Sequence, residues 1–206
     1  MFGPIWPALY DHITKKTDEA GFGELRHALV ADALGATLEI GAGTGANLRH
    51  YPADLERLVL VEPDARMLSR LQRRVAEQRP EAEVAAATAE HLPFPDASFD
   101  TAIVTLVLCS VADPVAALAE IRRVLRPNGR LLLAEHVRSA DPRIAAKQDK
   151  IPFPYPLIGC HPNRDTLREI QASPLAVESV RSGELPKAPQ IERPMIVGTA
   201  RRPASA

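Results

Sequence analysis

Short apolar runs alternate along the chain with longer segments in which apolar residues recur every three to four positions. The short runs are rich in leucine and β-branched residues, a composition that predicts buried strands. We expect strands at residues 37–40, 58–61, 83–87, 101–106, 130–136, 177–181 and 195–200. Strands separated by helices are typical of α/β proteins, so we predict a doubly wound, mostly parallel seven-stranded sheet with helices on both faces.

Two of the longer segments have the spacing of amphipathic helices. In residues 64–78 the apolar side chains share one helix face, and they are Met67, Leu68, Leu71 and Val75. Residues 114–125 show the same periodicity after Asp113, which can cap a helix that starts at Pro114. Residues 8–34 predict further amphipathic helices ahead of the sheet.

Composition and charge limit the kinds of partner. The 206 residues are 46% hydrophobic and 25% charged, which suits one packed globular domain. A formal net charge of -1 without a long basic run argues against nucleic acid as a partner. The start has no signal-peptide pattern and no window is apolar enough to span a membrane, so we expect a cytoplasmic protein, with peripheral membrane contact and the oligomeric state left open. Cys109 and Cys160 lie at no metal-ligand spacing, and we expect no metal site.

A glycine-rich turn follows the first predicted strand, at Gly41-Ala42-Gly43-Thr44-Gly45. Glycines let the backbone adopt positive φ and approach a ligand closely. In a dinucleotide-binding turn the third glycine would come one residue later, and the carboxylate of Glu39 would repel a pyrophosphate. S-adenosylmethionine carries an ammonium and a sulfonium but no phosphate, so Glu39 favours it as the ligand.

Glu62 directly follows the second predicted strand and lies 21 residues after Gly41, the spacing at which an acid binds ribose hydroxyls in nucleoside sites. A helix-capping role is the plain alternative, but Asp64 already supplies the cap. Glu62 is therefore the expected ribose ligand.

With these residues the sequence resembles the class I S-adenosylmethionine-dependent methyltransferases. Residues 38–45 are similar to their first motif, 61–63 to their ribose acid and 89–94 to the segment that contacts adenine. Residues 98–100, 104–108 and 123–131 resemble the quinone C-methyltransferase and phospholipid N-methyltransferase group. Asn128 departs from the usual glycine, and we expect the turn to survive because asparagine tolerates left-handed angles.

The resemblance implies the Rossmann-like methyltransferase fold, with a helical cap over 1–35, a cofactor-binding core over 36–137, and a lid loop with the last strands over 138–206. It places Gly41, Gly43 and Asn47 near the methionine portion, Glu62 and Pro63 at the ribose, Glu90 near the adenine amino group and Leu106 beneath the sulfonium. The full set of expected cofactor contacts is Glu39, Gly41, Gly43, Gly45, Asn47, Glu62, Pro63, Ala89, Glu90 and Leu106. Phe94 and Phe99 are expected to pack as core residues.

A narrower resemblance, to small thiol S-methyltransferases and phosphatidylethanolamine N-methyltransferases, lies in residues 10–12, 50–52, 135–137 and 159–166. Polar candidates for the acceptor side are His136 and Tyr10 as catalytic residues, and His50, Cys160, His161 and Arg164 as substrate contacts. Plain alternatives stay open: His136 as a polar group at the sheet rim, Arg164 at a helix start, and Cys160 as a small apolar filler. Residues 151–158 either form an apolar lid near Trp6 and Tyr10 or only connect two elements.

These features predict in-line transfer of a methyl group from S-adenosylmethionine to a small, moderately hydrophobic acceptor, which is a thiol, amine, phenol or quinol. Positioning does most of the work in such a displacement, and a thiol needs no strong base because it is partly ionised near neutral pH. Two alternatives remain: a regulatory protein that binds S-adenosylmethionine without catalysis, and an NAD(P)-dependent oxidoreductase, which the glycine spacing and Glu39 disfavour.

Overall fold

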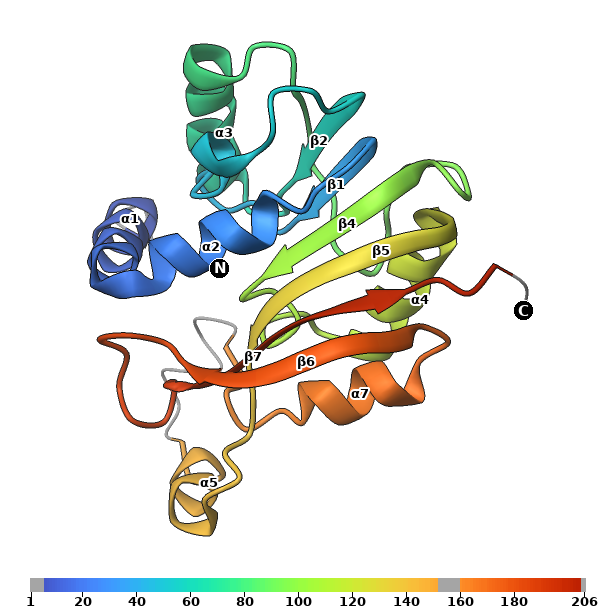
Figure 1. Cartoon of the computed structure of the whole chain (residues 1–206). Helices are drawn as coiled ribbons and strands as arrows, with labels where there is room; N and C mark the ends of the chain where they lie inside the picture. Colours follow the sequence, from blue (N-terminus) through green and yellow to red (C-terminus); the bar gives the residue numbers. More distant parts are fainter. Residues whose placement is uncertain (1–5, 152–159, 205–206) are drawn as a thin grey trace.

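The computed structural model describes residues 6–151 and 160–204, and its centre is a seven-stranded sheet of order β3-β2-β1-β4-β5-β7-β6 (Figure 1). The strands are β1 (Ala36–Ile40), β2 (Arg57–Val61), β3 (Glu83–Ala85), β4 (Phe99–Thr105), β5 (Leu125–His136), β6 (Ala176–Glu184) and β7 (Pro194–Arg201). Strands β1 to β5 pair in parallel, and β7 is antiparallel to both β5 and β6. The predicted mostly parallel α/β sheet is confirmed.

Helices cover both faces of this sheet. They are α1 (Trp6–Thr17), the π-helix η1 (Asp18–Phe22), α2 (Gly23–Val30), the 3₁₀ helix η2 (Leu48–His50), α3 (Ala65–Gln78), α4 (Pro114–Val124), α5 (Pro142–Gln148) and α7 (Thr166–Ala172). No helix among the described residues is both long enough and apolar enough to cross a membrane.

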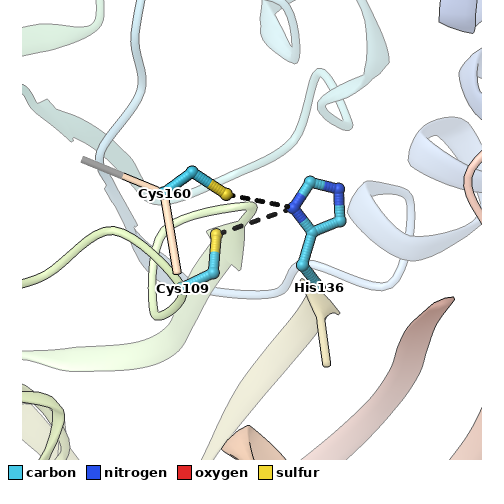
Figure 2. Close-up of side chains that lie close together, drawn as sticks. All are labelled: Cys109, His136 and Cys160. Carbon is cyan, nitrogen blue, oxygen red and sulfur yellow. Dashed lines mark hydrogen bonds between the residues drawn. The ribbon is translucent and has the colours of Figure 1, made fainter. Parts of the chain in front are cut away.

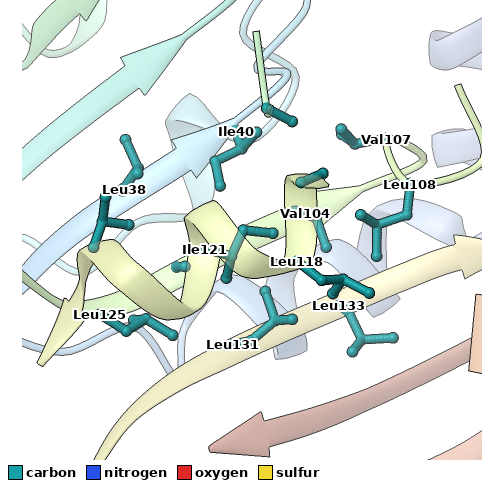
Figure 3. Packing of buried hydrophobic residues seen from close by; sticks show 14 of the residues in the cluster. Leu38, Ile40, Val104, Val107, Leu108, Leu118, Ile121, Leu125, Leu131 and Leu133 are labelled. Carbon is teal, nitrogen blue, oxygen red and sulfur yellow. The ribbon is translucent and has the colours of Figure 1, made fainter. Parts of the chain in front are cut away.

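Two buried clusters lie on the opposite faces of the sheet. On one face Leu118 and Ile121 of α4 pack against Leu38, Val104 and Leu131 of β1, β4 and β5 (Figure 3). On the other face, side chains of α2 and α3 pack on residues of β2, β4 and β5, and the cluster includes Val30, Leu71, Val75, Leu60, Ile103 and Leu132. The strands of a sheet covered on both sides are apolar on both faces, and this is why they occur in the sequence as short, continuous apolar runs.

The predicted boundaries differ from the observed ones by one to five residues at one or both ends of each strand, and two of the differences are informative. Strand β3 ends at Ala85 rather than at residue 87. Helix α4 ends at Val124, because Leu125 is extended (φ -68°, ψ 139°), and the expected turn around Asn128 is an irregularity inside β5. Asn128 has a φ of 66°, so asparagine does adopt the left-handed conformation expected of it.

Both predicted helix caps are present. The Asp64 side chain accepts hydrogen bonds from the backbone N–H groups of Arg66 and Met67, at 2.9 and 3.1 Å. The Asp113 side chain does the same for Val115 and Ala116 at the start of α4.

Asp64→Ala should lower the free energy of unfolding by about 1 kcal/mol, because two N–H groups of the first turn of α3 lose their acceptor. Chemical denaturation measures the change. Asp64→Asn is the matched control and should stay close to wild type, since asparagine caps a helix as well as aspartate does. Equal losses in the two variants would contradict the capping role.

Candidate functional site

The carboxyl ends of the parallel strands place the glycine turn, Glu62, the loop after β4 and the end of β5 along one edge of the sheet (Figure 1). Gly41, Gly43 and Gly45 have φ values of 65°, 59° and 89°, so three residues of the turn use left-handed angles. Ligands of open α/β sheets bind at this edge. The fold therefore brings the expected site residues together at one edge of the sheet, and their contact with a ligand stays a prediction.

Glu62 joins the end of β2 to the glycine turn. Its Oε2 accepts a hydrogen bond from the N–H of Gly43 and its Oε1 accepts one from the N–H of Asp64, both at 2.9 Å. The residue is 7% exposed, and burial raises the pKa of its carboxyl group. An ionised carboxylate has about four lone-pair positions, so two remain for ribose hydroxyls. Pro63 is exposed next to it.

Glu39 lies beneath the turn in a buried polar network. Its Oε2 accepts a hydrogen bond from the Tyr51 hydroxyl at 2.5 Å, and its Oε1 accepts one from Asn47 Nδ2 at 2.8 Å. Asn47 Nδ2 also donates to Thr105, and Asn47 Oδ1 accepts a bond from Arg26 at 3.1 Å. Burial raises the pKa of Glu39 to about 7 despite these donors. Glu39 and Asn47 thus have protein partners at every polar side-chain atom, and their contact with a cofactor stays a prediction.

Helix α1 covers the glycine turn. A Cβ atom on Gly43 would lie only 3.3 Å from the Tyr10 hydroxyl oxygen. Asp11 of the same helix accepts a hydrogen bond from the Thr44 hydroxyl at 2.5 Å and pairs with Arg70 and Arg74 of α3 at 2.6 and 2.9 Å. The structure therefore places Tyr10 at the cofactor turn, and burial raises the pKa of its phenol.

The loop after β4 is held by Glu135, a fully buried residue to which the sequence assigned no role. Its carboxylate accepts hydrogen bonds from the N–H groups of Val107 at 2.8 Å and Cys109 at 3.3 Å. Burial raises its pKa to about 7. Leu106 begins this loop with a φ of 59°, and its N–H donates to the carbonyl of Ala134. Glu135 is thus a positioning residue for the segment that the resemblance places beneath the sulfonium.

Gly41 contacts that loop directly, because a Cβ on it would lie 2.7 Å from Val107 Cγ2. Gly41→Ala should lower the free energy of unfolding by about 2 kcal/mol, through the left-handed angle and this clash. Thermal or chemical denaturation measures the loss. Gly183→Ala in β6 is the control: its Cβ would meet Met195 at an ordinary 3.6 Å, and we expect little change. Equal stability of the two variants would contradict the close packing at Gly41.

The expected adenine segment is fixed by hydrogen bonds to neighbouring elements. Glu90 Oε1 accepts bonds from the N–H groups of Ala112 and Asp113, at 2.9 and 3.3 Å, and Ala89 is buried. Phe94 and Phe99 pack edge to face, with ring centroids 5.2 Å apart, and Phe99 is fully buried. The expectation that these two rings belong to the core is confirmed.

Two cysteines and a histidine meet at the end of β5 (Figure 2). His136 Nδ1 lies 3.6 Å from Cys160 Sγ and 3.9 Å from Cys109 Sγ. His136 is 6% exposed, and its Nε2 has no hydrogen-bond partner among the residues that the structure describes. The interaction with Cys160 and burial raise the pKa of the Cys109 thiol. Spacing along the chain predicts no metal site, but the fold brings these three potential metal ligands together.

The remaining candidates have different environments. The Arg164 guanidinium donates hydrogen bonds to the carbonyls of Leu108 and Val111, so it braces the loop after β4. The N–H of His161 donates to the carbonyl of Cys109 at 2.8 Å. His50 lies instead beside His27, with ring centroids 5.5 Å apart, and burial lowers its pKa to about 4. Residues 152–159, which make up nearly all of the expected lid, lie outside the described residues.

Comparisons with known proteins agree with this geometry. A family model described as a methyltransferase domain matches residues 38–133. Human thiol S-methyltransferase TMT1B is 39% identical over 119 residues, which are 56% of this chain and 48% of that protein. Human thiol S-methyltransferase TMT1A is 31% identical over 169 residues, covering 79% of this chain and 69% of that protein. Demethylmenaquinone methyltransferase of Renibacterium salmoninarum is 34% identical over 139 residues, covering 62% and 57%.

The fold is similar to a solved structure from Thermotoga maritima, with a TM-score of 0.68. That protein is described as an S-adenosylmethionine-dependent methyltransferase and a possible histamine N-methyltransferase. It is 21% identical, and the match covers 96% of this chain and 98% of that one. The sheet order and the glycine turn define the Rossmann-like methyltransferase fold. With the relatives above, the chain belongs to the class I S-adenosylmethionine-dependent methyltransferases, although the match spans only about half the length of TMT1B.

S-adenosylmethionine is the cofactor that this family implies, and the turn fits it. The lack of a side chain at Gly43 allows close packing at the turn, where Tyr10 now lies, and Glu62 keeps lone pairs for ribose hydroxyls. The carboxyl groups of Glu39 and Glu62 give the site the acidic character that suits a cationic ligand. The family assignment removes the nicotinamide alternative.

Proposed function

We propose that the protein transfers the methyl group of S-adenosylmethionine to the sulfur of a small, moderately hydrophobic thiol. The observation that carries this proposal is the set of side chains on the expected acceptor side of the site. Cys109, His136 and Cys160 meet there, and the nearby carboxylate of Glu135 already accepts backbone N–H groups. A site without a free carboxylate base suits an acceptor that ionises near neutral pH, as a thiol does. The two thiol S-methyltransferase relatives support the same choice.

The cofactor, when bound, supplies an electrophilic methyl group. In this proposal Glu62 orients the ribose, and Tyr10 and the rest of α1 shield the glycine turn from water. Glu135 and Arg164 hold the loop after β4 at a fixed position, which serves the close alignment that an in-line displacement requires. The acceptor thiol, which is partly ionised near neutral pH, would release its proton to water. Its sulfur would bond to the methyl carbon as the bond from that carbon to the sulfonium sulfur breaks, and S-adenosylhomocysteine would leave.

The test is an acceptor screen with isotopically labelled S-adenosylmethionine and four acceptor classes: alkyl thiols, phospholipid amines, quinols and phenols. We expect label in S-methyl products, identified by mass spectrometry, and none with Glu62→Ala. Methylation of a quinol or an amine in preference to every thiol would overturn the proposal. Tight binding of S-adenosylhomocysteine without methylation of any acceptor would favour the regulatory alternative.

A further inference from the structure

The three side chains at the end of β5 form a group whose ligand atoms all lie within 4.8 Å of one another. Cys109 comes from the loop after β4, His136 is the last residue of β5, and Cys160 precedes α7 (Figure 2). Cys109 and His136 are 1% and 6% exposed, and Cys160 is partly exposed. We propose that these three residues bind a zinc ion.

The distances fit a tetrahedral zinc ion. With bonds of about 2.3 Å to sulfur and about 2.05 Å to nitrogen, tetrahedral angles require a sulfur to nitrogen separation of about 3.6 Å. The observed separations from His136 Nδ1 are 3.6 Å to Cys160 Sγ and 3.9 Å to Cys109 Sγ. Both sulfur to nitrogen separations are therefore close to those of a tetrahedral zinc site.

The ligand types select the metal. Thiolates and imidazole are the ligands that zinc prefers, whereas calcium and magnesium require oxygen. The group of three contains no carboxylate, and both oxygens of the neighbouring Glu135 accept backbone N–H groups. A borderline-soft divalent ion is thus favoured over a hard one.

Hydrogen bonds fix the backbone on which the three ligands sit. The N–H of Cys109 donates to Glu135, and the carbonyl of Cys109 accepts the N–H of His161, the residue next to Cys160. The carbonyl of His136 accepts the hydroxyl of Thr166 at 3.2 Å. These bonds hold the three backbone segments together, so the approach of the two thiols to His136 follows from the packing of three elements.

Three protein ligands leave one position of a tetrahedral zinc ion open, an arrangement typical of catalytic rather than structural zinc. An acceptor thiol that entered this position would release its proton to solvent and be held as its thiolate, because a coordinating thiol is deprotonated. This last step rests on the proposed function, whereas metal binding does not.

The test measures zinc binding to the reduced, chelator-treated full chain, without methyl donor or acceptor, by competition with a chromophoric chelator. We expect one tight site per chain, and in the cobalt-substituted protein the sulfur-to-cobalt charge-transfer and intense d–d bands of tetrahedral coordination. Cys109→Ser, His136→Asn and Cys160→Ser should each weaken zinc binding by more than about 100-fold, since even outer contacts contribute 10- to 100-fold. His12→Asn, at an exposed histidine of α1, is the control and should bind zinc as wild type does.

Circular dichroism and S-adenosylhomocysteine binding show whether each variant is folded, and Cys160→Ala at the partly exposed position provides a second replacement. A reduced wild-type chain that binds no zinc would overturn the proposal. So would folded cysteine variants that bind zinc as tightly as wild type. Because no methyl transfer is involved, failure of the zinc site leaves the proposed reaction intact, and failure of the acceptor screen leaves the zinc site intact.

Discussion

Raising the pH from about 5 to about 8 should lower the free energy of unfolding by about 3 kcal/mol for each of two buried carboxyl groups, Glu39 and Glu135. Burial raises the pKa of both from 4.5 to about 7. Between these pH values the folded chain binds more protons than the unfolded chain, so the stabilising contribution is complete below about pH 4.5 and is lost as the pH rises through 7.

Urea denaturation of wild type, Glu39→Gln and Glu135→Gln at the two pH values measures this effect. An amide does not titrate, so in each variant the free energy of unfolding should change less between the two pH values than in wild type. This holds even if the variant is less stable at both pH values. Glu77→Gln, at an exposed carboxyl group of α3, is the matched control and should keep the wild-type difference. The prediction is wrong if the free energy of unfolding of Glu39→Gln and Glu135→Gln changes between the two pH values as much as that of wild type. These carboxyl groups would then be ionised in the folded chain.

Features that depend on neighbouring residues could be predicted from the sequence. The strands around Ile40 and Val61 are apolar runs because both faces of the sheet are covered. The caps at Asp64 and Asp113 act on residues two and three positions away, which makes them visible locally. The boundary near Leu125 was missed because pairing of Leu125 with Phe99 of β4, a tertiary contact, ends the helix.

The residues that organise the site could not be assigned from the sequence, because their partners are far away along the chain. Glu135 acts on residues 107–109, and Arg26 of α2 reaches Asn47 through a buried hydrogen bond. In the sequence Glu135 is only an acidic residue near the end of a strand, and Arg26 is only an arginine in an amphipathic helix. Neighbouring residues therefore do not reveal either role. The meeting of Cys109, His136 and Cys160 depends in the same way on the packing of β4, β5 and the segment before α7.

Glu62→Gln should weaken the binding of S-adenosylhomocysteine by about 100-fold, since two charge-assisted hydrogen bonds to ribose hydroxyls would be lost or reversed in polarity. The wild-type carboxylate accepts the N–H groups of Gly43 and Asp64, and an amide can accept only one of the two. The variant should therefore also lose some stability, and calorimetric affinity alone would not separate the two effects.

A ligand analogue without the two ribose hydroxyls separates them. Wild type should bind this analogue about 100-fold more weakly than S-adenosylhomocysteine, whereas Glu62→Gln should distinguish the two ligands far less, because the group that recognises the hydroxyls is gone. Asp64→Asn, adjacent to Glu62 but directed at the first turn of α3, should retain the wild-type preference. A Glu62→Gln protein that still prefers the ligand with hydroxyls by 100-fold would assign ribose recognition to another residue and leave Glu62 as a brace between β2 and the glycine turn.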